Sequence, residues 1–282
     1  MSHSPAAPKT GFLLEDFRIF HIASSSGPVP PHYHDFCKVL ALQKGSVRYT
    51  IEGRSYDLMP GDLVLVDRGE IHCPQISEKQ SYERTILYLS PDFLEQVSPG
   101  EPLNRCFIQA RYRHSSVLRL GEEERRPLFS LLNRMRKSQK NEEAYASSLL
   151  NRVLLLEFLI SLNRISMNSH ASYLHTGALN YQVSGLIAYI NDHLEEDLSI
   201  PLLSRECCLS PYHMMRLFKE ETGCTIGSYI TQKRLSLARE LMASGQNATS
   251  ACFGAGFSSY SSFLRAYKKQ FGETPGRRAY SK

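Results

Sequence analysis

Three histidines and one lysine in the first third of the chain have the types and spacing of a binding site. His32 and His34 stand two residues apart in "GPVPPHYHDFCKVL", Lys38 follows them, and His72 lies in "PGDLVLVDRGEIHCPQ". Residues two apart on a strand share a face, so both imidazoles of the first pair can point into one interior. Imidazole binds metals and also exchanges hydrogen bonds with polar molecules. The pattern therefore indicates a metal centre or a polar pocket.

A second set of residues recurs near the end of the chain. "CCLSPYHMMRLFKEETG" and "FGAGFSSYSSFLRAYKKQFGETP" both place a turn before a helix that carries aromatic, Arg and Lys side chains. Arg reads guanine in the major groove of DNA, and the N-terminus of a helix suits a phosphate. This repeated pattern predicts nucleic-acid binding.

The first set must be positioned by strands. Residues from about 12 to 90 form short apolar runs separated by turn residues, as in the hairpin pattern around Gly53 and the turn at 60–62. Several short strands at this spacing predict a small β-barrel or sandwich.

Two amphipathic helices are predicted next, within 121–139 and 142–165. The second is apolar on more than one face, so it must be covered on two sides. One side can cover the β-structure, and the other can meet a second subunit or a further part of the same chain; both interpretations stay open. Residues 164–180 are polar and aperiodic and are interpreted as a linker between domains 1–163 and 181–282.

The second set must be positioned by two helix-turn-helix units. Cys208 and Gly256 mark the turns, Ser210 and either Ser258 or Ser259 cap the following helices, and a longer helix joins the units. Helical periodicity directs these side chains outward: Tyr212, Met215, Arg216 and Lys219 in the first unit, and Tyr260, Ser261, Leu264, Arg265 and Lys268 in the second. We expect the two reading helices to stand about one DNA turn apart, roughly 34 Å.

The stretch 198–280 resembles the DNA-binding domain of AraC-type transcriptional regulators. The residues that carry the resemblance are "LSPYHMMRLFKEETG", the segment from Tyr229 to Met242, and "GFSSYSSFLRAYKKQFGETP". The resemblance implies base-reading positions at Tyr212, Met215 and Arg216, and at Tyr260, Ser261, Leu264 and Arg265. The chain departs from the family where Cys208 replaces a common glycine, and where Ala248 and Ala251 replace larger aliphatic residues.

The N-terminal pattern resembles the cupin-type sensor domain found ahead of many such DNA-binding domains. The cupin metal pattern has a glutamate four residues after the second histidine, and this chain has Lys38 there. A protonated lysine repels a divalent cation and supplies no anionic ligand. We therefore favour a polar effector pocket of His32, His34, Lys38 and His72, with no cofactor. A metal held by the three histidines, and histidines that only hydrogen-bond within the barrel wall, stay open as alternatives.

Charge and cysteine content agree with this division. Residues 198–282 contain 12 Lys and Arg against 5 Asp and Glu, which is +7, so the rest of the chain, with a total of +5, carries −2. A basic C-terminal third is typical of a nucleic-acid footprint. The chain has 7 cysteines without a C-x-x-C motif and begins without the apolar core of a signal peptide, so we expect a cytoplasmic protein.

The sequence predicts a two-domain α+β protein that regulates transcription and is not an enzyme. We expect duplex DNA, a small effector such as a sugar or related metabolite, and a second copy of the chain as partners, with RNA polymerase as a further partner of an activator. The rival hypothesis is a cupin-like metalloenzyme with an accessory helical domain, which requires a metal with an open coordination position.

Overall fold

The computed structural model describes residues 13, 15–23, 29–76, 81–98, 100–141, 143–174 and 181–276. These residues form two compact units. The N-terminal unit holds the described residues from 13 to 174 except 31–35, and the C-terminal unit holds 181–276 together with 31–35. Each unit has its own core.

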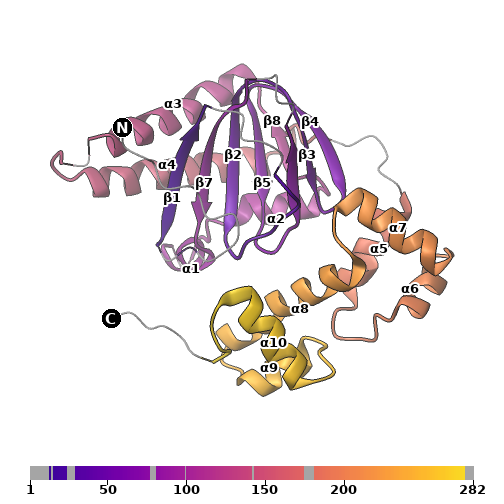
Figure 1. Cartoon of the computed structure of the whole chain (residues 1–282). Coiled ribbons are helices and arrows are strands. Elements are labelled where there is room, and N and C mark those ends of the chain that lie inside the picture. The colour runs from indigo at the N-terminus through magenta and orange to yellow at the C-terminus, as the bar shows by residue number, and fades with distance from the viewer. Residues whose placement is uncertain are drawn as a thin grey trace. The chain divides into compact units, whose positions relative to one another are not determined.

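The N-terminal unit consists of two antiparallel sheets and four helices (Figure 1). The five-stranded sheet has the order β1-β7-β2-β5-β8 and the three-stranded sheet the order β4-β3-β6. The strands are β1 (Phe17–Ile22), β2 (Cys37–Lys44), β3 (Val47–Ile51), β4 (Arg54–Leu58), β5 (Asp62–Val66), β6 (His72–Gln75), β7 (Glu83–Leu89) and β8 (Val117–Arg119). The helices are α1 (Pro91–Gln96), α2 (Arg105–Tyr112), α3 (Glu122–Gln139) and α4 (Ser147–Met167).

The turn between β3 and β4 follows the predicted hairpin. Glu52 and Gly53 have φ values of 46° and 73°. Two successive positive φ angles match the right-handed twist of the flanking strands, and glycine adopts one of them at little cost.

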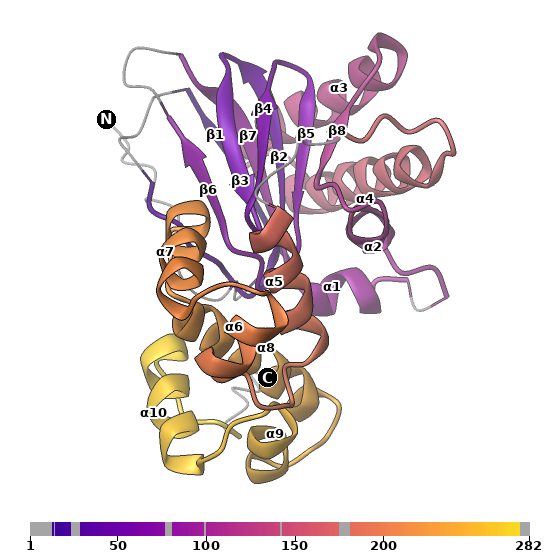
Figure 2. The same cartoon turned by 90° about the vertical axis from the view of Figure 1, so that its right-hand side faces the viewer.

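Strand alternation divides the five-stranded sheet into two faces. Val39, Leu65 and Leu87 belong to the main core together with buried residues of α1 to α4, such as Leu128 and Phe158. Figure 2 shows α3 and α4 on one side of the strands. The opposite face, which includes Lys38, is turned toward the three-stranded sheet, since the Lys38 Nζ atom lies 2.9 Å from the Tyr49 hydroxyl of β3. Two sheets with facing surfaces agree with the expected β-rich domain, a small β-barrel or sandwich.

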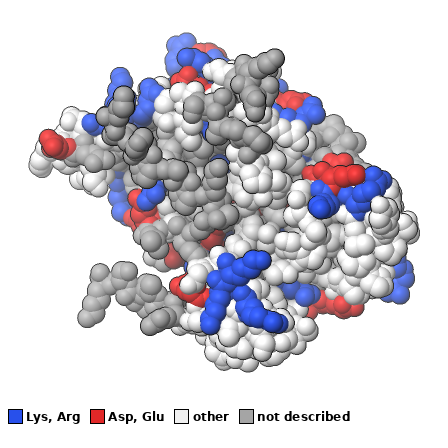
Figure 3. Space-filling view, in the orientation of Figure 1, with Lys and Arg blue, Asp and Glu red and all other residues white. Residues whose placement is uncertain are grey.

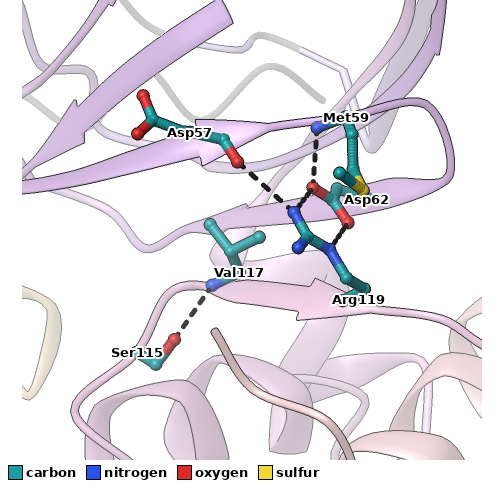
Figure 4. A network of polar contacts seen from close by, with 6 residues as sticks. All are labelled: Asp57, Met59, Asp62, Ser115, Val117 and Arg119. Atoms are coloured by element: carbon teal, nitrogen blue, oxygen red, sulfur yellow. Dashed lines mark hydrogen bonds and ion pairs between the residues drawn. The ribbon is translucent and has the colours of Figure 1, made fainter. Parts of the chain in front are cut away.

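A buried ion pair ties β5 to β8. Arg119 donates to both carboxylate oxygens of Asp62, at 2.9 and 2.8 Å, and the backbone amide of Met59 donates to the same carboxylate at 2.9 Å (Figure 4). Arg119 also donates to the Asp57 carbonyl at 3.3 Å, which reaches the other sheet. Asp62 is 1% exposed, so removing its partner would leave a buried charge and cost about 3–5 kcal/mol.

The first part of the expected linker, residues 164–174, belongs to the N-terminal unit. Residues 164–167 belong to α4. The Arg119 amide donates to the Ser172 carbonyl at 2.9 Å and the Leu174 amide to the Val117 carbonyl at 2.9 Å, which holds 172–174 against β8. Residues 175–180 of the expected linker lie outside the described residues.

The C-terminal unit is helical: α5 (Tyr181–Asp192), α6 (Ile200–Glu206), α7 (Pro211–Thr222), α8 (Ile226–Ala243), α9 (Ala248–Gly254) and α10 (Tyr260–Phe271). Helix α8 contributes to two hydrophobic clusters. Tyr229, at its start, packs edge-on against Phe218 of α7 with ring centroids 5.5 Å apart. Leu235 and Ala238, further along, pack with Phe263 and Tyr267 of α10. One helix thus carries the cores of both helix-turn-helix units, which confirms the predicted two-domain α+β fold.

Within the described ranges, no helix is both long and apolar enough to cross a membrane.

Candidate nucleic-acid interface and ligand site

The two predicted turns have the same backbone conformation but are built from different residues. Gly256 has φ +86°, and a Cβ atom there would lie 2.2 Å from the Leu194 carbonyl oxygen and 2.9 Å from the Arg234 Nε atom. Cys208 has φ 53°, a left-handed conformation that costs a residue with a side chain about 1–2 kcal/mol. The first turn therefore tolerates a side chain at the price of strain, whereas the second admits only glycine.

Serines occupy the N-cap positions of both α7 and α10. The Ser210 hydroxyl accepts a hydrogen bond from the His213 amide at 3.4 Å, and Pro211 takes the first helical position. Ser259, rather than Ser258, is the N-cap of α10, and its side chain makes no capping hydrogen bond. The N-terminal amides of α10 are therefore less fully satisfied within the chain than those of α7.

Helix α7 presents the expected outer face. Met214 and Phe218 are buried, whereas Tyr212, Met215, Arg216 and Lys219 are exposed, Tyr212 to 75%. The Arg216 Nη1 atom donates to the Glu220 carboxylate at 2.9 Å. The guanidinium expected to read a base is thus held by an acidic residue of its own helix.

Helix α10 presents a more basic face. Ser261, Arg265 and Lys268 are exposed, and no Asp or Glu occurs between Tyr260 and Phe271. Tyr260 and Leu264 are only half-exposed, because the Tyr260 ring packs on Phe263 with centroids 5.7 Å apart. In Figure 3, Lys and Arg side chains gather where α10 lies, while basic and acidic groups are mixed over α7.

Lys38 and His72 come together inside the N-terminal unit. The His72 Nδ1 atom lies 2.9 Å from the Glu70 carbonyl, which can only accept, so Nδ1 carries the proton. The His72 Nε2 atom then accepts from the Lys38 Nζ atom at 3.3 Å. The Lys38 Nζ atom also lies 2.9 Å from the Tyr49 hydroxyl. Lys38 and His72 are 5% and 1% exposed.

The environment of Lys38 disfavours its charge. Burial, and then the nearby cation of Arg84, lower the Lys38 pKa from 10.5 to about 7. Among the described residues, no carboxylate lies within ion-pair distance of Lys38, so its charged form has no anionic partner within the chain. A nearby anion would raise this pKa and favour the charged amine.

The other two residues of the expected pocket lie in the segment 31–35. The His32 and His34 rings have centroids 6.3 Å apart, and His34 is 3% exposed. This segment groups with the C-terminal unit, whereas Lys38 and His72 group with the N-terminal unit. Across the described part of the chain, no three His, Cys, Asp or Glu side chains converge as metal ligands.

Four further buried residues of the N-terminal unit were not selected from the sequence: Tyr49, Tyr82, Arg84 and Tyr88. Strand alternation offered a signal for two of them, since residues 84, 86 and 88 of β7 share parity and face the same way. Arg84 is 6% exposed, and its guanidinium carbon lies 4.0 Å from the centroid of the Tyr82 ring. Tyr88 stands opposite Lys38 in the pairing of β7 with β2.

Comparison with known proteins covers both units. Residues 21–159 match the model of the AraC-like ligand binding domain, and residues 203–278 match that of a helix-turn-helix domain. The HTH-type transcriptional activator RhaS of Escherichia fergusonii is 24% identical over 257 residues, which are 88% of this chain and 87% of that protein. RhaS of an Enterobacter species is 25% identical over 248 residues, 87% and 86% of the two chains. The crystal structure of ToxT from Vibrio cholerae aligns with a TM-score of 0.37 and 14% identity over 92% of this chain and 95% of that one.

Proposed function

The chain belongs to the AraC family of transcription regulators, and from that premise we propose that it binds a specific duplex site through α7 and α10 under the control of a small polar effector. The C-terminal unit is the DNA-binding domain, and the N-terminal unit is the ligand-binding domain. One observation carries the proposal: two helix-turn-helix units share α8 as a common core, and each exposes an Arg and a Lys on the outer face of its second helix.

Packing of α8 against both helix-turn-helix units supports simultaneous reading of two grooves. Tyr229 is fully buried against Phe218, and its hydroxyl donates to the Asn191 side chain at 3.3 Å. Phe263 and Tyr267 fix α10 against the other end of α8. We expect the two reading helices to enter successive major grooves on one side of the duplex, about 34 Å apart.

Individual side chains have distinct expected roles. Arg216 and Arg265 donate to base edges, preferably to guanine. Met215 and Leu264 have no donors and contact thymine methyl groups or the shape of the groove. Ser210 and Ser259, at the helix N-termini, lie where phosphate oxygens bind, and Lys219 and Lys268 neutralise phosphates.

The effector is expected in the N-terminal unit, at Lys38 and His72. Both side chains are buried donors or acceptors in the barrel interior, where a polar ligand can replace the hydrogen bonds that they now make. A ligand with several hydroxyl groups, such as a sugar or a related metabolite, suits this set of groups. Control of transcription requires that the effector bind two states of the protein with different affinities.

Helix α4 supports a homodimer. Leu149, Val153, Ile160 and Met167 are exposed by 61%, 51%, 42% and 49%. With the half-buried Leu156 they recur at alternating spacings of four and three, or of seven, and form one stripe along the helix. Such a repeat is the seam of a coiled coil, and a second copy of the stripe is its natural partner.

Sedimentation of the full chain tests this dimer. Val153→Glu with Ile160→Glu should convert a dimer to a monomer, whereas Ser148→Glu, exposed on the same helix outside the stripe, should not. A wild-type monomer at micromolar concentration would contradict the homodimer.

Activation through contact with RNA polymerase remains a further proposal, which transcription with purified polymerase on a bound promoter would test.

Selection of fragments from random duplex DNA by the full chain tests the function itself. We expect enrichment of a motif in two blocks, with affinity that falls steeply as salt rises because Lys and Arg displace counterions. Absence of any enriched sequence at moderate ionic strength would overturn the proposal.

A further inference from the structure

The interior of the N-terminal unit buries two cations near each other. Lys38 on β2 and Arg84 on β7 are 5% and 6% exposed. Their strands pair in the register Lys38 with Tyr88 and Leu42 with Arg84, so both side chains lie on the face turned toward the three-stranded sheet. After burial, the nearby charge of Arg84 is the second cause that lowers the Lys38 pKa. A buried cation is unfavourable unless an anion compensates it.

The groups around these cations are aromatic hydroxyls and an imidazole. Tyr49 and His72 contact the Lys38 amine, and Tyr82 lies under the Arg84 guanidinium. Arg84 donates to the Tyr82 carbonyl at 2.9 Å. The Tyr82 hydroxyl is buried and has no hydrogen-bond partner among the described residues. A buried hydroxyl left unsatisfied is unfavourable unless a ligand completes it.

Deepening the proposed function, on which this inference rests, we propose that the effector is a small organic anion whose acidic group binds beside Lys38 and Arg84. An anionic oxygen there supplies the counter-charge that Lys38 lacks within the described chain, and it can accept from the Tyr82 hydroxyl. The shared chemistry is an acidic oxygen group, which a carboxylate or a phosphate ester provides. The tyrosine hydroxyls and the His72 imidazole suit neighbouring hydroxyl groups of the same ligand.

Acetate and inorganic phosphate are the probes for this site. Thermal unfolding of the full chain is followed at pH 6.5 with sodium chloride, sodium acetate or sodium phosphate at equal ionic strength. For each protein we take the midpoint of thermal unfolding in acetate or phosphate minus the midpoint in chloride. We expect this difference to be larger for wild type than for Lys38→Met. The comparison with the variant removes the general effect of each salt on folding. The anion that gives the larger excess identifies the acidic group.

Lys44→Met is the matched control, because Lys44 lies on the same strand and carries the same charge but has a side chain 71% exposed. It should keep the full excess stabilisation. If Lys38→Met does not fold, Lys38→Gln serves in its place. Equal responses of wild type and the Lys38 variant, or loss of the excess in Lys44→Met as well, would overturn the proposal.

The pH dependence gives a second readout. The charged amine binds the anion, and the pKa of Lys38 without ligand is about 7. Binding must therefore take up a proton above pH 7, and affinity should fall by up to about tenfold per pH unit there. Tyr49, His72 and Arg84 face the amine, and each of them is kept in Lys38→Arg, so a loss of affinity that any of these groups causes would persist in that variant. Lys38→Arg should bind equally at pH 6.5 and 8.5, and an unchanged pH response in Lys38→Arg would contradict the assignment.

Failure here is distinct from failure of the proposed function. If the anion responses are equal while random DNA still yields a motif, the chain remains a regulator whose effector is not an anion held by Lys38. If no motif is recovered while the responses differ, the anion site stands and the regulator does not.

Discussion

Helices α7 and α10 occupy equivalent places in two copies of one motif, yet they present different surfaces. The α7 segment carries Arg216 and Lys219 against Glu220 and Glu221, whereas α10 carries three basic residues and no acidic one. Arg216 is paired with Glu220 within its own helix, while Tyr212 and Met215 stand exposed beside it. The two helices therefore have the same place in the fold but different surface charge.

The two helix-turn-helix units also differ in the residue that forms the turn. Gly256 lies against the Leu194 carbonyl, so close packing as well as backbone conformation requires glycine there. Cys208 adopts the same left-handed conformation with a side chain that is exposed. The second unit is thus the more tightly constrained one and the more basic one. We infer that α10 supplies most of the electrostatic attraction to DNA, and that α7 reads the groove more through shape and apolar contact.

The largest expected effect is on stability, and it differs between the two turns. Gly256→Ala should destabilise the C-terminal unit by about 2–5 kcal/mol, because it combines left-handed strain with a clash against backbone. Cys208→Gly should stabilise the first unit by up to about 1 kcal/mol by relieving strain. Hydrogen exchange of amides in α9 and α10, compared with those in α6 and α7, measures both changes. A Gly256→Ala variant as stable as wild type, or a Cys208→Gly variant that is less stable than wild type, would contradict this difference.

The next effect concerns the two arginines. Arg265→Ala should weaken binding to a selected site by about 2–3 kcal/mol, and Arg216→Ala by about 1 kcal/mol, because Glu220 competes for the Arg216 guanidinium. Fluorescence anisotropy with a labelled duplex measures both. Lys233→Ala, a change of the same charge on α8, is the control for general electrostatics. A greater loss from Arg216→Ala would reverse the assigned roles, and equal losses on all sequences would mean that both arginines contact only phosphates.

A smaller effect should appear in the salt dependence. Lys268→Ala should reduce the slope of log affinity against log salt by about 1, as expected when one phosphate contact is lost. Lys219→Ala should change it less, because the neighbouring Glu220 and Glu221 already offset its charge. The same slope change for both lysines would remove the electrostatic distinction between the helices.

The smallest effect comes from releasing Arg216. Glu220→Gln removes the ion pair but keeps the shape of the side chain, and exposed pairs of this kind contribute up to about 1 kcal/mol. We expect a gain in DNA affinity of a few-fold, with little change in stability. Glu221→Gln is the matched control, since Glu221 makes no ion pair among the described residues. A loss of affinity in Glu220→Gln would show that the pair holds Arg216 in its binding conformation.

The sequence predicts local structure better than it predicts partners distant in the chain. The hairpin at Gly53, the inward residues Phe218 and Phe263, and the glycine turn at Gly256 follow from turn chemistry and periodicity, which act over a few residues. The pairing of Asp62 with Arg119 spans 57 positions and has no local pattern. Nor does any local rule place Lys38 within reach of Arg84.

The candidate sites show the same limit. Exposure of Tyr212 and Arg216 follows from helical geometry, but the half-burial of Tyr260 depends on how Phe263 packs beneath it. The Arg84 face of β7 could have been found by strand alternation. Its approach to Lys38 depends on the register between β7 and β2, which the sequence does not specify locally.

Base-modification interference on a selected duplex tests the central claim most directly, that two reading helices lie along one side of one duplex. Guanines whose methylation blocks binding should form two patches about 10 base pairs apart on one face, and Arg265→Ala should remove one patch while leaving the other. A single patch, or two patches that weaken equally in Arg265→Ala, would contradict the account.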